Sequence, residues 1–161
     1  MAAPHSDAAF AAAFNNAIDT IGRGLYYGTG IQPRVTLALA SPPTVEAEWL
    51  VTGDHISANG SIDEGVVATV SDNTLAALGV ALQAAGALMS LAVTELSAHT
   101  VRSIQPGTMV RMRCSLDSDP FITQPHATTV FCNSMDPACV YAVVFAAAAR
   151  TAIANTRRPK L

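Results

Sequence analysis

The sequence predicts a single α+β domain in which an antiparallel sheet of about six strands wraps around one long central helix. Its 161 residues are enough to bury a substantial core without the support of disulfides or structural metal ions, and half of them are hydrophobic. Segments in which apolar and polar residues alternate surround one long apolar run, which indicates strands around a buried helix. The chain contains no internal repeat and no low-complexity linker, so we expect one domain over residues 1–161.

The predicted elements follow the order helix, two strands, long helix and then about four strands. Apolar residues at helical spacing predict an amphipathic first helix over residues 8–22. Alternation predicts two half-buried strands, from Arg34 to Ala40 and from Thr44 to Val51. The residues Ser41-Pro42-Pro43 supply the turn between these strands.

The long helix is predicted to begin near Asp63 and Glu64, because carboxylates suit the positive end of a helix dipole. This helix is apolar almost all round, and such a helix belongs in the centre of a fold, wrapped on most sides. Four more strands are predicted over residues 89–102, 108–116, 127–133 and 139–148. The alanine-rich segment 146–154 leaves a final helix open instead, and residues 155–161 form a basic tail.

The composition excludes several classes of partner and cofactor. A formal net charge of −3 and a pI near 5.7 supply no basic field for a phosphate backbone, so we expect no nucleic-acid binding. The cysteines Cys114, Cys132 and Cys139 are odd in number and form no C-x-x-C pair, which indicates neither a disulfide framework nor a zinc site. His55 and His99 are too far apart to indicate a metal site. We therefore expect an intracellular protein without a metal or redox cofactor.

One apolar stretch must be tested as a membrane span. The segment from Leu75 to Val93 contains no charged residue and is long enough to cross a bilayer. However, Gly79 and Gln83 lower its hydrophobicity, and no basic cluster flanks it. The N-terminus also lacks a basic region before its apolar part, which argues against a secretory signal. We therefore predict no membrane span.

Asp72 is the only charged residue between Gly65 and Thr94. Burial of an unpaired carboxylate is far more unfavourable than burial of a methylene. We therefore expect this residue to have either a charged or polar partner or a functional role. On a helix, Asp72 shares one face with Gly65, Thr69 and Ala76. Such a face would line a narrow channel with small groups and one carboxylate, which is a candidate general base or nucleophile.

A second interpretation of the same residues is structural. The segment from Val66 to Val70 also fits a strand, and Ser71, Asp72 or Asn73 would then cap a helix that starts at Thr74. The spacing alone leaves both interpretations open.

Two motifs resemble one known family. Residues 63–72, DEGVVATVSD, resemble the segment H-G-G-x-x-A-T-L-x-D that opens the central helix of hotdog-fold acyl-CoA thioesterases of the PaaI-like group. The match covers the second glycine, the alanine-threonine pair and the terminal aspartate. Residues 101–107, VRSIQPG, resemble a strand of that family that ends R-P-A-R-P-G, and they match its arginine, proline and glycine. The resemblance covers roughly Val45 to Leu116, and the order and separation of the motifs add to its weight.

The resemblance implies an acyl-CoA thioesterase that acts on a fatty or aromatic acyl-CoA, with coenzyme A as part of the substrate. It implies a homodimer or homotetramer with sites between protomers. Asp72 would be the base or nucleophile, and backbone N–H groups of Glu64 and Gly65 would polarise the carbonyl. The sequence departs from the family where Asp63 and Glu64 replace His-Gly and Ser57 replaces an asparagine. The alternative is a non-catalytic hotdog protein that binds acyl-CoA or a protein partner.

Further residues are predicted to contact the substrate. They are Ser57, Asn59, Asp63, Thr69, Asn73 and Arg102. Ser57 and Asn59 could instead only make a turn. Arg102, together with Arg111 and Arg113, could receive coenzyme A phosphates or be merely solvated.

The last three residues, Pro159-Lys160-Leu161, resemble a variant of the Ser-Lys-Leu peroxisomal address. A functional address would place the protein in a peroxisome or glycosome. The alternative is a soluble basic tail on a cytoplasmic protein.

Overall fold

The computed structural model describes residues 7–19, 30–31, 33–84, 89–116 and 124–152 of the chain. These residues form two α-helices, one short 3-10 helix and six strands. In chain order the elements are α1 (Asp7–Ala17), β1 (Arg34–Ala40), β2 (Pro43–Leu50), η2 (Gly53–His55), α3 (Glu64–Ala84), β3 (Met89–Thr100), β4 (Met109–Leu116), β5 (His126–Asn133) and β6 (Val140–Ala152).

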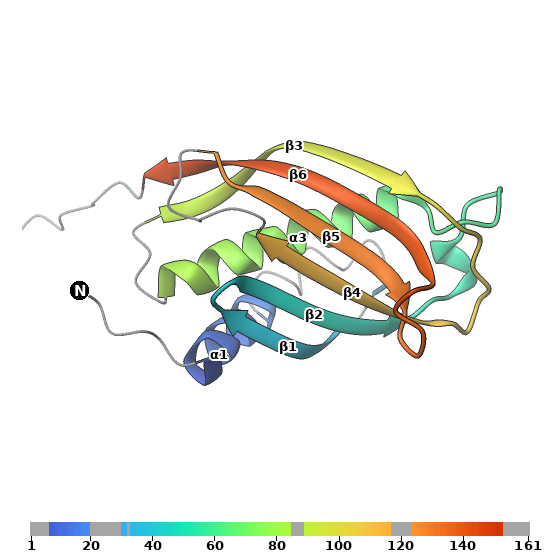
Figure 1. Cartoon of the computed structure of the whole chain (residues 1–161), viewed down its shortest axis with the longest axis horizontal. Helices are drawn as coiled ribbons and strands as arrows, with labels where there is room; N and C mark the ends of the chain where they lie inside the picture. The colour runs from blue at the N-terminus through green and yellow to red at the C-terminus, as the bar shows by residue number, and fades with distance from the viewer. Residues whose placement is uncertain (1–6, 20–29, 32, 85–88, 117–123, 153–161) are drawn as a thin grey trace, which may run out of the picture.

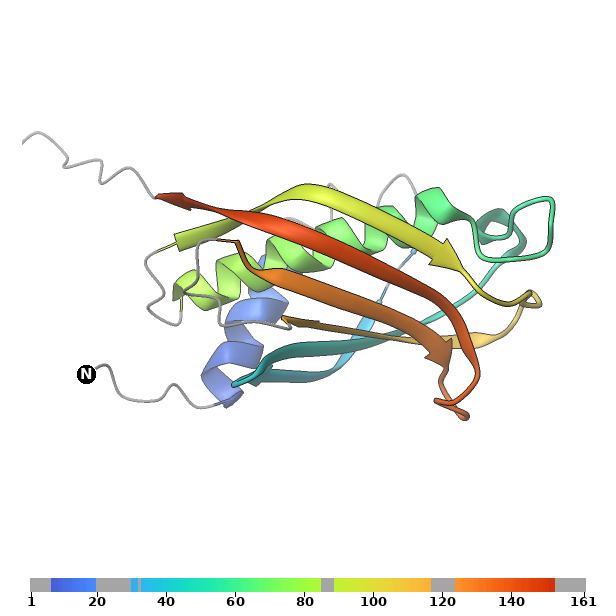
Figure 2. The ribbon, with the colours of Figure 1, turned by 45° about the horizontal axis from the view of Figure 1, so that its top comes forward.

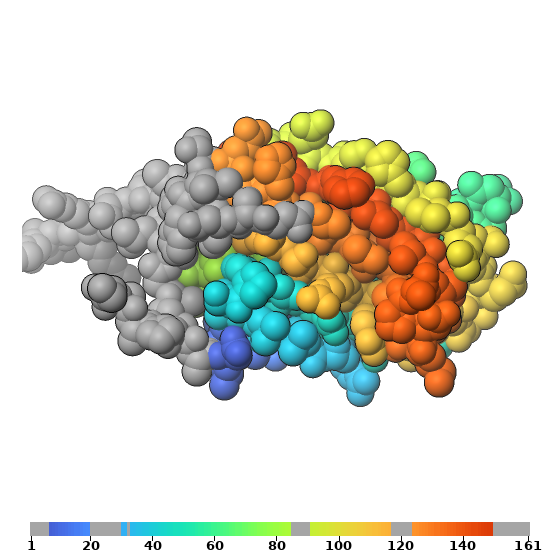
Figure 3. Space-filling model, viewed as in Figure 1, coloured from blue at the N-terminus to red at the C-terminus, as the bar shows by residue number. Residues whose placement is uncertain are grey.

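The six strands form one antiparallel sheet in the order β1-β2-β4-β5-β6-β3 (Figure 1). Strands β1 and β3 are therefore its two edges. The sheet curls over α3, which lies along its inner face (Figure 2). Figure 3 views the opposite, outer face, where β2, β4, β5 and β6 lie toward the viewer.

This architecture confirms the predicted α+β class and the sheet of six strands around a long helix. Strand β1 has the predicted bounds, Arg34–Ala40. Strand β6 continues to Ala152, so the alternative of a final helix that starts at Ala146 is wrong. It continues because β3 is long enough to pair with β6 as far as Ala152. The end of the predicted first helix, residues 20–22, and the basic tail lie outside the described residues.

Helix α3 joins two parts of one core. Its first half buries Val67 and Val70 in a cluster that contains Trp49 and Phe131, whose rings meet edge to face at 5.7 Å. Its second half packs in a cluster with Phe10 and Phe14 of α1. These two residues lie one helical turn apart and are almost completely buried, which explains why the apolar residues of α1 follow helical spacing.

The helix runs without interruption through Asp72, so the interpretation of Val66 to Val70 as a strand followed by a cap is wrong. The hydroxyl group of Ser71 donates a hydrogen bond to the Val67 carbonyl at 2.8 Å. The hydroxyl group of Thr74 donates in the same way to the Val70 carbonyl at 2.7 Å. Both polar side chains are therefore satisfied inside the helix, four residues back along the chain.

Helix α3 approaches β3 closely at Gly79. A Cβ atom on Gly79 would lie 3.1 Å from the backbone nitrogen of Leu91 and 3.2 Å from its Cβ atom. A side chain at this position would push the helix and the strand apart. Glycine therefore fixes where α3 and β3 meet.

By length and composition alone, α3 could cross a membrane. However, 61% of its most apolar 18-residue window is buried inside the domain. The sheet, including its edge strand β3, and α1 surround most of the helix, which identifies it as a core helix and indicates no membrane span.

Candidate active site

The face of α3 that points away from the sheet carries Asp72. The residues along this face, here called the α3 stripe, are Gly65, Ala68, Thr69, Asp72, Ala76, Val80 and Gln83. Asp72 is exposed, whereas Thr69 and Ala76 beside it are half-buried. The prediction that Gly65, Thr69, Asp72 and Ala76 share one face is confirmed. The carboxylate therefore avoids the burial penalty that its apolar neighbours in sequence would impose.

Asp63 caps the first turn of α3. Its Oδ1 atom accepts the N–H groups of Gly65 at 2.9 Å and Val66 at 3.2 Å. Its carbonyl accepts the N–H group of Val67 at 3.1 Å. An aspartate at this position satisfies N–H groups that the helix leaves unpaired, and its charge suits the helix dipole.

This cap decides which of the predicted carbonyl-polarising groups is available. The Gly65 N–H group is already bonded to Asp63. The Glu64 N–H group precedes the first intrahelical hydrogen bond, and it donates no hydrogen bond among the described residues. Of the two predicted donors, Glu64 is therefore the one that remains open, while its exposed side chain adds a negative charge at the same helix end.

The loop before α3 is held by its own polar groups. The Oδ1 atom of Asn59 accepts the Ser61 N–H group at 3.0 Å and the hydroxyl groups of Ser57 and Ser61. Gly60 has a φ of 81°, which favours glycine in this tight turn. Ser57 and Asn59 thus build the turn, and their contact with a substrate stays a prediction.

A buried histidine ties this loop to the helix. His55 is only 3% exposed, and its Nδ1 atom accepts the Thr52 N–H group at 3.1 Å. The His55 carbonyl accepts the N–H group of Asp63, the cap of α3, at 2.9 Å. His55 is therefore a satisfied core residue that orients the start of the helix.

The two motif segments lie against each other although they are far apart in sequence. Ser61 forms a β-bridge with Ser103, and the Ile104 N–H group donates to the Gly60 carbonyl at 2.9 Å. Arg102 is exposed beside this contact, with its Nη1 atom 3.8 Å from the Cys139 sulfur. The structure thus brings the Arg102 segment to the loop that precedes α3.

Asn73 lies beside Asp72 on the flank of the α3 stripe and is only 4% exposed. Its Nδ2 atom is buried without a hydrogen-bond partner among the described residues. An unpaired buried donor is unfavourable, so this side chain could gain a hydrogen bond from a bound molecule. Its predicted role in substrate binding stays a prediction.

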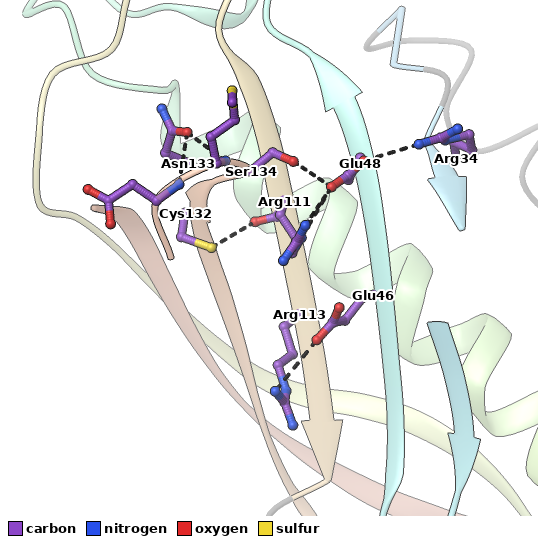
Figure 4. A network of polar contacts seen from close by, with 10 residues as sticks. Arg34, Glu46, Glu48, Arg111, Arg113, Cys132, Asn133 and Ser134 are labelled. Carbon is purple, nitrogen blue, oxygen red and sulfur yellow. Dashed lines mark hydrogen bonds and ion pairs between the residues drawn. The ribbon is translucent and has the colours of Figure 1, made fainter. Parts of the chain in front are cut away.

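Arg111 and Arg113 lie on the outer face of the sheet, away from the α3 stripe (Figure 4). Arg111 donates to Glu48 through Nη2 at 3.0 Å and Nε at 3.2 Å, and Arg113 lies 3.5 Å from Glu46. The two pairs stand directly opposite each other in the β2–β4 ladder. Both arginines are thus occupied by carboxylates and lie apart from the other predicted site residues.

Sequence reasoning missed the network that gathers on Glu48. The Ser134 hydroxyl group donates to Glu48 from the β5–β6 turn, and Arg34 lies 3.3 Å from its other oxygen. The Ser134 hydroxyl, followed by the Arg111 guanidinium, lowers the pKa of the Glu48 carboxyl group. The sequence did contain a signal for this network. Glu46 and Glu48 occupy alternate positions of one predicted strand, and the two arginines occupy alternate positions of another.

The three cysteines are free thiols. Burial raises the pKa of Cys132, which keeps this thiol protonated. Within the described ranges, no group of three or more histidine, cysteine, aspartate or glutamate residues could hold a metal ion. Burial also raises the pKa of Tyr141, whose hydroxyl accepts a hydrogen bond from Asn133 at 3.1 Å.

No protein-family model and no curated protein matches the sequence. Solved structures do match the fold. The PaaI protein of the phenylacetic acid degradation operon of E. coli superposes with a TM-score of 0.67 at 10% identity, over 90% of this chain and 95% of that one. A thioesterase from Haemophilus influenzae superposes with a TM-score of 0.69 at 12% identity, over 98% of this chain and 99% of that one.

A third solved structure contains a ligand. It is a hypothetical thioesterase of Streptococcus pneumoniae, determined with coenzyme A, and it superposes with a TM-score of 0.63 at 9% identity. The match covers 86% of this chain and 94% of that one. Identities this low establish a shared fold, and the order of the elements agrees with it. The chain therefore has the hotdog fold that the PaaI protein and these thioesterase structures share.

Proposed function

We propose that this chain is a thioester hydrolase that cleaves a fatty or aromatic acyl-CoA to the free acid and coenzyme A. The observation that carries the proposal is the exposed carboxylate of Asp72 on the central helix, which has no partner in the described part of the chain. The shared fold supports it, because a hypothetical thioesterase of this fold was solved with coenzyme A. The reaction needs no metal ion or redox cofactor, since a carboxylate and backbone N–H groups supply its chemistry.

In this proposal Asp72 either removes a proton from the attacking water or attacks the thioester carbonyl itself. The carbonyl oxygen gains negative charge as the bond to the attacking oxygen forms. The Glu64 N–H group, at the positive end of the α3 dipole, would stabilise that charge. The bond to sulfur then breaks, and coenzyme A leaves as its thiolate takes up a proton. If Asp72 removed the proton from water, it returns that proton to the thiolate; if Asp72 attacked, water then cleaves the acyl–Asp72 anhydride to the free acid.

The geometry of one helix leads to a shared site. Asp72 lies eight positions after Glu64, and a helix rises about 1.5 Å per residue, so the two groups lie about 12 Å apart along the axis. The attacking atom and the carbonyl-polarising donor must each lie about 3 Å from the reacting carbonyl group. We therefore propose that Asp72 of one copy works with the Glu64 N–H group of another, in a homodimer or homotetramer.

The activity is tested by incubating the purified protein with a panel of acyl-CoAs of different chain length and with aryl-CoAs, while free thiol release is followed. Turnover of at least one substrate is expected. The second candidate is a protein that binds acyl-CoA without hydrolysis. It is favoured by the Asp63 carboxylate, which occupies two N–H groups of the first turn. Binding of coenzyme A without turnover of any substrate would establish that alternative.

The shared site is tested with two defective variants, Asp72→Asn and Glu64→Pro. Proline lacks an N–H group but is well tolerated at the first position of a helix, so Glu64→Pro removes the donor and keeps the helix. Each variant alone should be nearly inactive. Co-expression should restore about a quarter of wild-type activity, because half of the dimers are mixed and one of their two sites is intact. No recovery in mixed dimers would show that each site lies within one copy.

A further inference from the structure

Helix α3 buries an amide group for which the described fold has no use. Asn73 is 4% exposed, and its Nδ2 atom has no hydrogen-bond partner among the described residues. The other polar side chains that α3 buries, Ser71 and Thr74, each donate a hydrogen bond to the carbonyl group four residues before. A buried donor without a partner is unfavourable, so an apolar residue of the same shape at this position would make the fold more stable. The Asn73 amide is therefore a candidate for binding a ligand.

A second buried donor in the same part of the core also lacks a partner within the described ranges. It is the Nε1 atom of Trp49, whose side chain is 3% exposed. Trp49 belongs to the core cluster of Val70, which lies one helical turn before Asn73. The Thr44 hydroxyl oxygen, which is also buried without a partner, lies near the opposite end of β2. The nitrogen atoms of Asn73 and Trp49 can only donate, so a molecule bound to them must supply acceptors.

The flank of α3 around Asn73 is apolar, and it borders the exposed carboxylate of Asp72. Val66 and Val70 precede Asn73 on this flank by two turns and one turn. Val66 is half-buried and packs against the cluster that contains Val70. Thr69 is half-buried between this flank and Asp72, and its hydroxyl makes no hydrogen bond in the described part of the chain. An apolar surface with a few hydrogen-bond donors suits an apolar group that carries oxygen.

We propose that Asn73 selects an acyl group with a neutral, hydrogen-bond-accepting oxygen on its third carbon, as in a 3-hydroxyacyl-CoA or a 3-oxoacyl-CoA. The Nδ2 atom of Asn73 donates to this oxygen, and the apolar chain beyond it packs against the cluster of Val66 and Trp49. This inference rests on the acyl-CoA ligand of the proposed function, but it does not require that the ligand be hydrolysed.

The position of Asn73 directly after Asp72 determines where the oxygen must lie. Successive Cα atoms are about 3.8 Å apart, and Asp72 acts on the thioester carbonyl from about 3 Å. A hydrogen bond from the Asn73 Nδ2 atom spans about 2.9 Å. The reacting carbon and the accepting oxygen are therefore close together in the acyl group, which fits an oxygen on the third carbon and excludes one at the far end of a long chain. A carboxylate is also excluded, because burial of an anion beside neutral donors alone is strongly unfavourable.

Thermal unfolding without a ligand tests whether the fold uses the amide. Leucine resembles asparagine in size and shape but has no donor, so Asn73→Leu should raise the melting temperature by about 2 to 8 °C. Asn73→Ala provides a second variant that is small enough to fit the same place. A lower melting temperature in both variants would show that the amide is satisfied in the ligand-free protein, for example by a water molecule, and would overturn the proposal.

Ligand binding tests the selectivity directly. Trp49 is the only tryptophan of the chain, so its fluorescence reports on the core cluster beside Asn73. The probes are non-hydrolysable thioether analogues of an acyl-CoA with a plain chain, with a 3-hydroxyl group and with a 3-oxo group. The wild type should bind both oxygenated analogues about 3- to 10-fold more tightly than the plain one. Asn73→Leu should lose both preferences together, because Nδ2 requires only an acceptor.

Gln83→Leu is the matched control, because it places the same side chain at an exposed position of the same helix. It should keep the wild-type preference. Equal binding of the three analogues by the wild type, or a preference that survives in Asn73→Leu, would overturn the role of Asn73 and leave the thioesterase proposal intact. A selective wild type that hydrolyses no acyl-CoA of the panel would instead support this binding role and contradict the hydrolysis. Binding of none of the analogues would overturn the proposed acyl-CoA ligand and this inference together.

Discussion

Two carboxylates of this chain lie on opposite sides of the sheet and in opposite surroundings. The side chain of Glu48 on the outer face is 11% exposed and receives hydrogen bonds from Ser134, Arg111 and Arg34. Asp72 on the α3 stripe is exposed, and it makes no hydrogen bond or ion pair among the described residues. Strand alternation produced the first arrangement, and helix periodicity produced the second.

The difference separates a structural carboxylate from a candidate reactive one. Glu48 is surrounded by donors that favour its charged form, so its removal should reduce the stability of the fold. Asp72 supports no neighbour that the structure describes, so its removal should leave the fold intact. An exposed carboxylate with no partner among the described residues is therefore the one of the two that we test for a catalytic role.

The largest expected effect is on turnover by the variant Asp72→Asn. Asparagine keeps the shape of the side chain but cannot act as base or nucleophile. We expect kcat/KM on the best acyl-CoA of the panel to fall by about a hundred- to ten-thousand-fold. The melting temperature should change little, because Asp72 is exposed and has no partner in the described part of the chain.

Gln83→Glu is the control for this variant, because it changes the charge at another exposed position of the α3 stripe. Its turnover should stay near the wild-type value. A folded Asp72→Asn protein with near-normal turnover would contradict the assignment, and Glu64 would then become the candidate carboxylate at this end of the helix.

The variant Glu48→Gln should show the reverse pattern. It keeps the volume but removes the charge that Arg111 and Ser134 contact, so we expect the melting temperature to fall by about 2 to 8 °C. Turnover measured below the new melting temperature should be unchanged. Glu46→Gln is the matched control, because Glu46 has a single, longer ion pair to the more exposed Arg113, and its effect should be smaller. Equal effects of both variants would contradict the importance of the network.

Acid titration tests how much the charge of Glu48 contributes to stability. The pKa of Glu48 is lowered in the folded protein, so the unfolded chain binds a proton there more readily. Its contribution to stability is therefore complete above the unfolded pKa of about 4.3 and is lost as the pH falls toward the lower folded pKa. The melting temperature of the wild type should fall more steeply below about pH 4.3 than that of Glu48→Gln. Parallel curves for the two proteins would contradict the lowered pKa.

The sequence predicted most of the fold because its elements are encoded locally. Alternating residues gave β1 its bounds, and the carboxylates of Asp63 and Glu64 correctly placed the start of α3. Local patterns could not decide whether Asp72 caps a helix or lies within one. That choice depended on the packing of Val67 and Val70 against the sheet.

The details of the candidate site were less predictable because they depend on hydrogen bonds between particular atoms. A motif shows that Asp63 replaces a histidine, but it does not show that the Asp63 carboxylate occupies the Gly65 N–H group. The Ser134 contact to Glu48 joins residues 86 positions apart in the sequence, so no local pattern predicts it. Cross-strand pairs such as Glu48 and Arg111 can be inferred only once the strand order is known.

The smallest expected effect comes from Arg34→Ala, which removes the third donor to Glu48. The side chain of Arg34 is 81% exposed, compared with 33% for Arg111, and its nitrogen lies 3.3 Å from Glu48 rather than 3.0 Å. Solvent screens an exposed ion pair, and ordering a long side chain opposes it, so we expect the melting temperature to fall by less than about 2 °C. Arg111→Ala should lower it more, because Glu48 would lose two hydrogen bonds on a more buried partner. If Arg34→Ala were as destabilising as Arg111→Ala, exposure would not govern the strength of this network, and the contrast between Glu48 and Asp72 would need another basis.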